Sequence, residues 1–138
     1  MASKNALLVL KFLVIILISF GFAKTSISGK WVKHAKGQNF TEYCSNAARS
    51  GRIASIDSLR DYDKEKSPKD QKYLSKKTRL QFDCSRKKFK IVSIQKYTEN
   101  MMKGKQLKSK KTSSSWQKVI SNSLNEMYLK KACNVRVN

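Results

Sequence analysis

The sequence predicts an α+β fold, in which an antiparallel sheet is covered on one face by a single C-terminal helix. Four or five segments between residues 31 and 97 have strand-like patterns, and residues 123–133 have a helical pattern. Two neighbouring strand segments are separated only by a short turn, so they must pair antiparallel. A run of strands followed by a helix is typical of a layered domain with segregated strands and helix.

The strand segments are residues 31–35, 40–44, 51–62, 73–84 and 89–97. The pattern is clearest in 73–84, where Leu80, Phe82 and Cys84 alternate with polar residues. A period of two predicts a strand with one buried and one solvated face.

The next segment, 89–97, is predicted to place Phe89 and Ile91 on one face and Val92 and Ile94 on the other. Residues 85–88 separate it from the preceding strand, a length typical of a hairpin turn. Two further segments, 63–70 with the only proline and the lysine- and serine-rich 103–115, are predicted to be solvated loops.

The C-terminal helix has a start signal and an apolar stripe. Ser123 and Glu126 have the spacing of a capping box, in which each side chain accepts from the other residue's free backbone N–H. The stripe follows the i, i+3, i+4, i+7 spacing of an amphipathic helix. Its members are Leu124, Met127, Tyr128 and either Lys131 or Ala132.

The first 23 residues resemble a secretory signal peptide. Lys4 and Lys11 precede an apolar run, and Gly21 and Ala23 give a small-x-small exit. A retained membrane anchor is the alternative, but only 12 residues separate Lys11 from Lys24, whereas a spanning helix needs about 20. We therefore expect a signal peptide over 1–23, one exported domain over 24–134, and a tail over 135–138.

The chain is strongly basic, with 30 Lys and Arg against nine Asp and Glu. Two of the basic residues lie in the leader, so 28 remain and the mature chain has a net charge of about +19. Such a surface attracts polyanions. Outside the cytoplasm these are acidic lipid head groups, sulfated glycans, acidic host proteins or free DNA. The alternative is that lysine is abundant throughout the source organism's proteins and marks no site.

Three cysteines, Cys44, Cys84 and Cys133, are present. An exported small domain favours a disulfide, and an odd number leaves one thiol over. Zinc binding is not expected, because His34 is the only histidine and no Cys-x-x-Cys exists.

The order of several motifs resembles the surface-adhesin protein E-like family of bacterial exported proteins, over residues 30–134. The most specific part is Leu59-Arg60-Asp61-Tyr62, followed about twenty residues later by Phe82-Asp83-Cys84. The other matching residues are Trp31, 40–44, Tyr73, Ser75, Arg79, Arg86, Tyr97, Trp116 and a closing helix that ends at Cys133.

This resemblance implies a sheet of about five to six strands and a disulfide between Cys84 and Cys133. It also implies binding of host matrix and serum proteins. From the residues themselves we expect no cofactor and no metal. The chain departs from the family in two respects. It lacks the lipid-attachment cysteine of a surface-anchored member, and it contains Cys44, which has no place in the family pattern and is expected as a buried thiol or an intermolecular link.

The candidate anion-binding residues form two basic runs. Arg86, Lys87, Lys88 and Lys90 flank Phe89 in the predicted hairpin, and they could bind a phosphate or sulfate chain. Lys108, Lys110 and Lys111 lie in a predicted flexible loop that could close over the same ligand. The alternative for both runs is a solvated turn or loop without a binding role.

No set of acid, base and nucleophile is recognisable, so we do not expect an enzyme. His34 is interpreted as a strand or surface residue. The carboxylates of Asp57, Asp61 and Asp63 are interpreted as partners of Arg52, Arg60 or nearby lysines rather than as metal ligands. The larger aromatic residues Trp31, Tyr62, Tyr97 and Trp116 are predicted to lie in the core or at its rim.

Together these patterns predict an exported, non-enzymatic binding domain with host macromolecules or anionic surfaces as partners. Its predicted location is the periplasm, the outer surface or the medium. The alternative is an exported protein that binds nucleic acid or lipopolysaccharide by charge alone.

Overall fold

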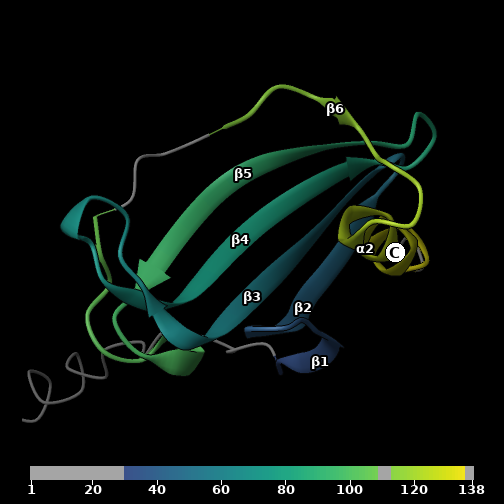
Figure 1. Cartoon of the computed structure of the whole chain (residues 1–138). Helices are drawn as coiled ribbons and strands as arrows, with labels where there is room; N and C mark the ends of the chain where they lie inside the picture. Colours follow the sequence, from purple (N-terminus) through teal and green to yellow (C-terminus); the bar gives the residue numbers. More distant parts are fainter. Residues whose placement is uncertain (1–29, 109–112, 136–138) are drawn as a thin grey trace, which may run out of the picture.

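The computed structural model describes residues 30–108 and 113–135. They form one six-stranded antiparallel sheet in the order β1-β2-β3-β4-β5-β6, with helix α2 across one face (Figure 1). The strands are β1 (Val32–Lys36), β2 (Phe40–Ser50), β3 (Ile53–Lys66), β4 (Tyr73–Asp83), β5 (Lys88–Tyr97) and β6 (Gln117–Lys118). The helical segments are η1 (Pro68–Asp70), η2 (Asn100–Met102) and α2 (Leu124–Cys133). The α+β fold and its single C-terminal helix are confirmed.

The expected leader (residues 1–23) and most of the expected tail lie outside the described residues. Among the residues that are described, no helix has the length and the apolar composition needed to cross a membrane.

Two strands are longer than the sequence predicted. β2 continues to Ser50, because a bulge between Ser45 and Ala48 interrupts the regular alternation that would have revealed it. β3 continues to Lys66, which pairs with Tyr73, so the predicted loop 63–70 is strand in its first half and η1 in its second.

The hairpin of β4 and β5 is confirmed, but the prediction of which β5 side chains share a face of the sheet was partly wrong. Leu80 pairs with Ile91, whereas Arg79 pairs with Ser93, so Val92 is the extra residue of a bulge. The bulge returns Ile94 to the face that Ile91 occupies, opposite to the prediction. Regular alternation alone could not reveal this shift.

The turn between these strands spans residues 84–87, one residue earlier than predicted, and Lys88 already belongs to β5. The Asp83 carboxylate holds the turn, because it accepts from the Ser85 hydroxyl at 2.8 Å and from the Arg86 N–H at 3.0 Å. These two hydrogen bonds lower the pKa of Asp83 below its ordinary value.

Helix α2 begins as predicted, with Ser123 as its N-cap and the Ser123 hydroxyl accepting from the Glu126 N–H. The Glu126 carboxylate, however, accepts from the N–H of Asn122 rather than from that of Ser123. The predicted stripe was wrong at Met127, which is exposed, and of the two residues predicted for its last position Ala132 is buried and Lys131 is exposed. The buried residues of the helix are Tyr128, Leu129 and Ala132.

The core lies between α2 and the sheet. It contains apolar residues of β2, β3, β4 and β5, Val119 just after β6, and residues of the helix: Cys44, Ala54, Ile56, Leu80, Phe82, Phe89, Val119, Tyr128, Leu129 and Ala132. At one end of this core a disulfide joins Cys84 to Cys133, with the two Cα atoms 5.8 Å apart. The implied disulfide is therefore confirmed, and it ties the end of the helix to the turn after β4.

Cys44 is a free thiol that is buried in this core. Among the large aromatic residues, Tyr62 is buried and Trp31 and Tyr97 are half-buried, as predicted. Trp116 is 39% exposed, so the prediction of a core or core-rim position was wrong for this residue.

Candidate functional site

The basic run of the β4–β5 hairpin meets the short strand β6. Lys88 pairs with Lys118, and Phe89 pairs with Gln117. One position further along the same register, the Lys90 ammonium lies 5.0 Å from the centre of the Trp116 ring, a cation–π distance. The sequence did not reveal this contact, because a two-residue strand has no periodic pattern.

These side chains lie on the sheet face opposite to α2. Phe89 is buried in the core under the helix, so its neighbours Lys88 and Lys90 point to the other face. Lys88 and Lys118 are exposed, and Ile120 just beyond them is 74% exposed. We call this surface the basic edge, and its members are Arg86, Lys87, Lys88, Lys90, Trp116 and Lys118.

The basic edge has little neutralising charge. The nearest carboxylate in the turn, Asp83, is bound by its own turn and lies 3.6 Å from the Arg52 guanidinium. In the described parts of the chain, no carboxylate comes within 4 Å of the charged nitrogens of Arg86 or of the edge lysines. Asp83 nevertheless pairs across the strands with Lys88, and the charge of Arg86 acts on it. Lys87, Lys90 and Lys118 are therefore the cations of this surface that are most available to an external anion.

Lys108, the described residue of the second basic run, is not brought to this edge. Leu107 donates its N–H to the Lys96 carbonyl, which places the following residue, Lys108, near the C-terminal end of β5. The hairpin lies at the N-terminal end of the same strand. Lys110 and Lys111 lie outside the described residues.

The predicted carboxylate cluster is divided among separate partners. Asp57 is fully buried and accepts from Arg79 Nε at 2.8 Å, with Asn46 and Lys77 also close. Burial alone would raise the pKa of Asp57. The partners together outweigh burial and lower the pKa, and the hydrogen bond from Arg79 has the largest effect among them.

The other two carboxylates also have partners of their own. Asp61 accepts from the Met101 N–H, and Asp63 forms an ion pair with Lys36 at 2.9 Å. Of the predicted partners, lysines are found beside Asp57 and Asp63. Arg52 and Arg60 bind Asp83 and Glu42 instead. Within residues 30–108 and 113–135, no group of His, Cys, Asp and Glu is arranged to hold a metal ion.

His34 packs on the helix. It is the extra residue of a bulge in β1, and its ring stacks on the Tyr128 ring with centroids 4.9 Å apart. Burial, and then the nearby charge of Lys131, lower the pKa of His34. Packing on Tyr128 accounts for the position of the ring, but the buried Nε2 has no hydrogen-bond partner among the described residues.

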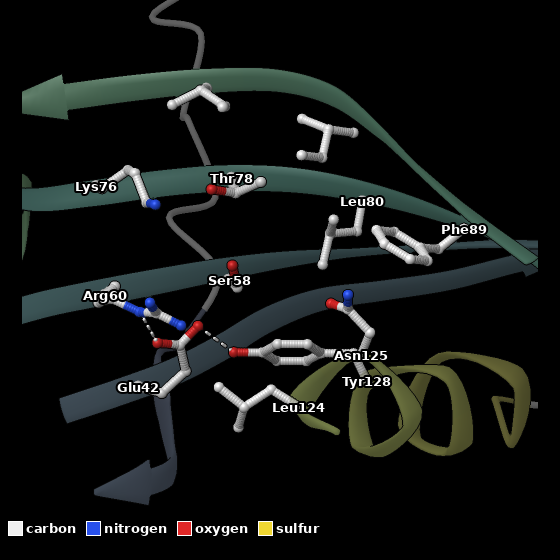
Figure 2. Close-up of a pocket in the computed structure, with 12 residues that line it drawn as sticks. Glu42, Ser58, Arg60, Lys76, Thr78, Leu80, Phe89, Leu124, Asn125 and Tyr128 are labelled. Carbon is white, nitrogen blue, oxygen red and sulfur yellow. Dashed lines mark hydrogen bonds and ion pairs between the residues drawn. The ribbon is translucent and has the colours of Figure 1, made fainter. Parts of the chain in front are cut away.

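A hollow of about 150 Å³ lies beside the first turn of α2, over β3, β4 and β5 (Figure 2). At one end Glu42, which is only 3% exposed, accepts from Tyr128 Oη at 2.5 Å and from Arg60 Nε at 2.7 Å. Burial raises the pKa of Tyr128, and the Glu42 carboxylate raises it further. Burial lowers the pKa of Arg60, but Glu42 outweighs this and raises it.

Three comparisons place the chain among known proteins. The family model described as surface-adhesin protein E matches residues 31–134. No curated protein sequence matches significantly. Three solved structures of Haemophilus influenzae protein E share the fold.

The selenomethionine form of Haemophilus influenzae protein E is 14% identical, with a TM-score of 0.59 over 78% of this chain and 88% of that chain. Crystal form II is 16% identical, with a TM-score of 0.59 over 77% and 87%. A third structure of the same protein is also 16% identical, with a TM-score of 0.58 over 77% and 84%. Identities this low establish similarity of fold, and the family match covers most of the chain. The protein therefore belongs to the surface-adhesin protein E family.

Proposed function

We propose that the protein is an exported, non-enzymatic binding domain that attaches to host extracellular or serum macromolecules through its basic edge. Membership of the surface-adhesin protein E family supports an adhesin-like role and a location outside the cytoplasm. The N-terminal pattern of residues 1–23 supports export by a cleaved leader. N-terminal sequencing of the protein from the periplasm, the outer membrane and the medium tests the leader and the location together.

The observation that carries the proposal is the exposed Trp116 between Lys90 and Lys118. Tryptophan contributes more than most residues to the binding energy of protein interfaces, and lysines beside it attract anionic groups. At the basic edge they are already adjacent on one face, and no carboxylate of the described residues neutralises them. The exposed Ile120 adds apolar surface next to them.

A second candidate is a protein that binds nucleic acid or lipopolysaccharide by charge alone. The excess of 30 basic over nine acidic residues favours it, since such a field attracts any polyanion. The two candidate functions differ in which charged groups determine the affinity. Charge-only binding depends on the total number of cations, whereas adhesin-type binding depends on the particular residues of the basic edge.

A charge-matched pair of variants tests the location of the surface. Lys87→Gln, Lys88→Gln and Lys90→Gln together remove three charges from the basic edge. Lys64→Gln, Lys103→Gln and Lys105→Gln together remove three exposed charges elsewhere. Binding of the mature proteins to immobilised basement-membrane extract and to heparin is then measured in the same buffer.

The proposal predicts that the edge variant loses about tenfold or more in affinity and that the control variant stays close to wild type. Equal losses in the two variants would instead favour binding by total charge. Normal binding by the edge variant would place the binding surface elsewhere.

A further inference from the structure

The hollow beside α2 has two chemically different ends. Figure 2 shows Arg60, Lys76 and Glu42 at one end and Leu80 and Phe89 at the other. Its volume of about 150 Å³ equals that of an apolar protein cavity large enough to hold benzene. The opening is therefore suited to a small molecule rather than to a chain of sugars or nucleotides.

The cationic end has an ammonium group that lacks a partner. Lys76 is half-buried, and no carboxylate of the described residues lies within 4 Å of its Nζ. Glu42, the acid of this pocket, is already bound by Arg60 and Tyr128. Burial lowers the pKa of Lys76, and the positive charges of Arg60 and of its cross-strand partner Lys96 lower it further, whereas the Glu42 carboxylate opposes this only in part. A bound anion would relieve this unfavourable environment.

The charge balance of this end indicates a monoanion. Among the residues that line the pocket, Arg60 and Glu42 form an ion pair, so Lys76 carries the lining charge that has no partner within 4 Å. The first turn of α2 adds Leu124 and Asn125 to the wall, and a helix N-terminus carries partial positive charge. Both features favour one negative head group rather than a multiply charged one.

The rest of the wall is apolar. Leu80 of β4, Phe89, Ile91 and Ile94 of β5, and Leu124 of α2 line it. Ile94 reaches this wall only because of the bulge at Val92. An apolar body placed here would leave water and contact hydrocarbon, which is the usual source of affinity in a small-molecule pocket.

We propose that this pocket binds a small monocarboxylate with a benzene-sized apolar body, its head group on Lys76 and its body against Leu124, Ile91 and Ile94. The site is on the face of the sheet opposite to the basic edge, so it is independent of the surface proposed for adhesion. The two proposals can therefore fail separately.

Benzoate is the probe, and the mature full-length protein is titrated with it by NMR at a fixed salt concentration. Benzyl alcohol has a similar body without the charge, and inorganic phosphate has charge without the body. The expected result is saturable shifts of the Ile91, Ile94 and Leu124 methyl groups with benzoate. Benzyl alcohol and phosphate should each bind at least about tenfold more weakly, because each lacks half of the interaction.

Three variants make the test specific. Lys76→Gln should weaken benzoate binding about tenfold or more, since it removes a charge-assisted hydrogen bond. Lys90→Gln removes the same charge from the opposite face and should leave benzoate binding unchanged. Thr78→Phe fills the hollow from β4 and should abolish binding while the circular dichroism spectrum remains that of the folded sheet.

Several outcomes would overturn the inference. Equal affinity for benzoate and benzyl alcohol would remove the role of Lys76. Shifts confined to the hairpin and β6, or an effect of Lys90→Gln equal to that of Lys76→Gln, would mean that benzoate binds the protein's general positive charge. The absence of saturable shifts in the pocket would exclude the site itself.

Discussion

The Tyr128 hydroxyl of helix α2 donates a 2.5 Å hydrogen bond to the Glu42 carboxylate of strand β2, and both residues are almost completely buried. The second Glu42 oxygen accepts from Arg60 Nε, so one carboxylate joins the helix to two strands. A buried carboxylate is tolerated only when it is paired in this way. This small network fixes the helix on the sheet and forms one end of the helix-side pocket.

We predict that Tyr128→Phe lowers the free energy of unfolding by about 1.5–3 kcal/mol, because it removes a hydrogen bond to a charged acceptor. Urea unfolding followed by circular dichroism measures the change. Tyr97→Phe is the matched control, since the Tyr97 hydroxyl makes only a long 3.4 Å hydrogen bond to Gln95 and the residue is half-buried. Equal losses in the two variants would contradict a special role for the Glu42 contact.

The disulfide should supply a large part of the stability of the domain. Cys84 and Cys133 are separated by 49 residues, and in the chain-entropy model a loop of this length is worth about 4 kcal/mol. The double variant Cys84→Ala, Cys133→Ala should therefore lose roughly that amount in urea unfolding of the mature chain. A loss below about 1 kcal/mol would contradict this prediction.

The Cys44 thiol should be shielded from reagents in the folded protein and should not form a disulfide with another chain. Because its side chain is buried in the core, a thiol reagent such as Ellman's reagent should react slowly with the folded protein. Unfolding without reductant should then expose one thiol per chain. Rapid reaction of the folded protein would contradict the buried position, and the absence of a thiol after unfolding would indicate an intermolecular disulfide.

Acid should weaken the fold through Asp57. The pKa of Asp57 is lower in the folded chain than its ordinary value of 3.8, so the stabilisation it gives is complete above that value. It is lost as the pH falls through the folded pKa, when the carboxylate is protonated and its bonds to Arg79 and Asn46 weaken.

The variant Asp57→Asn should lose about 1–3 kcal/mol near neutral pH, because it breaks the ion pair with Arg79. It should also show a smaller further loss than wild type when urea unfolding is repeated below about pH 4. A wild-type pH dependence that survives unchanged in Asp57→Asn would assign the acid sensitivity to other carboxylates.

The fold was predictable wherever a pattern was local. The alternation in β4 revealed a half-buried strand, the short turn revealed the hairpin, and Ser123 with Glu126 revealed the start of α2. The bulges at Val92 and in β2 were hidden, because each changes the facing of later residues without leaving a signal in composition.

The candidate sites depended on long-range contacts and were only partly predictable. The hairpin lysines could be identified as a basic run, but Trp116 and Lys118 join them only through the pairing of β6 with β5. From the sequence alone, a glutamate such as Glu42 is expected to be exposed to solvent. It is buried because Arg60 and Tyr128, which are far apart in the sequence, meet it in the folded chain. No periodicity connects such residues.

The aromatic part of the basic edge gives a further prediction. Trp116→Ala should weaken binding to basement-membrane extract about tenfold without altering net charge, because it removes exposed aromatic surface between Lys90 and Lys118. Trp31→Phe is the control for tryptophan loss in general, because Trp31 lies just before β1, the strand at the opposite edge of the sheet. Unchanged binding by Trp116→Ala would mean that the basic edge binds through its charges and that the aromatic ring does not contribute.

The most direct measurement of the central claim is the salt dependence of binding between the mature protein and immobilised basement-membrane extract. Attachment through a packed surface around Trp116 predicts less than about a tenfold loss in affinity between 50 and 200 mM salt. Binding through charge alone, with 6–10 anionic contacts, predicts a loss of about 10³-fold or more over the same range. A loss of that size would contradict adhesion through the basic edge as a specific surface.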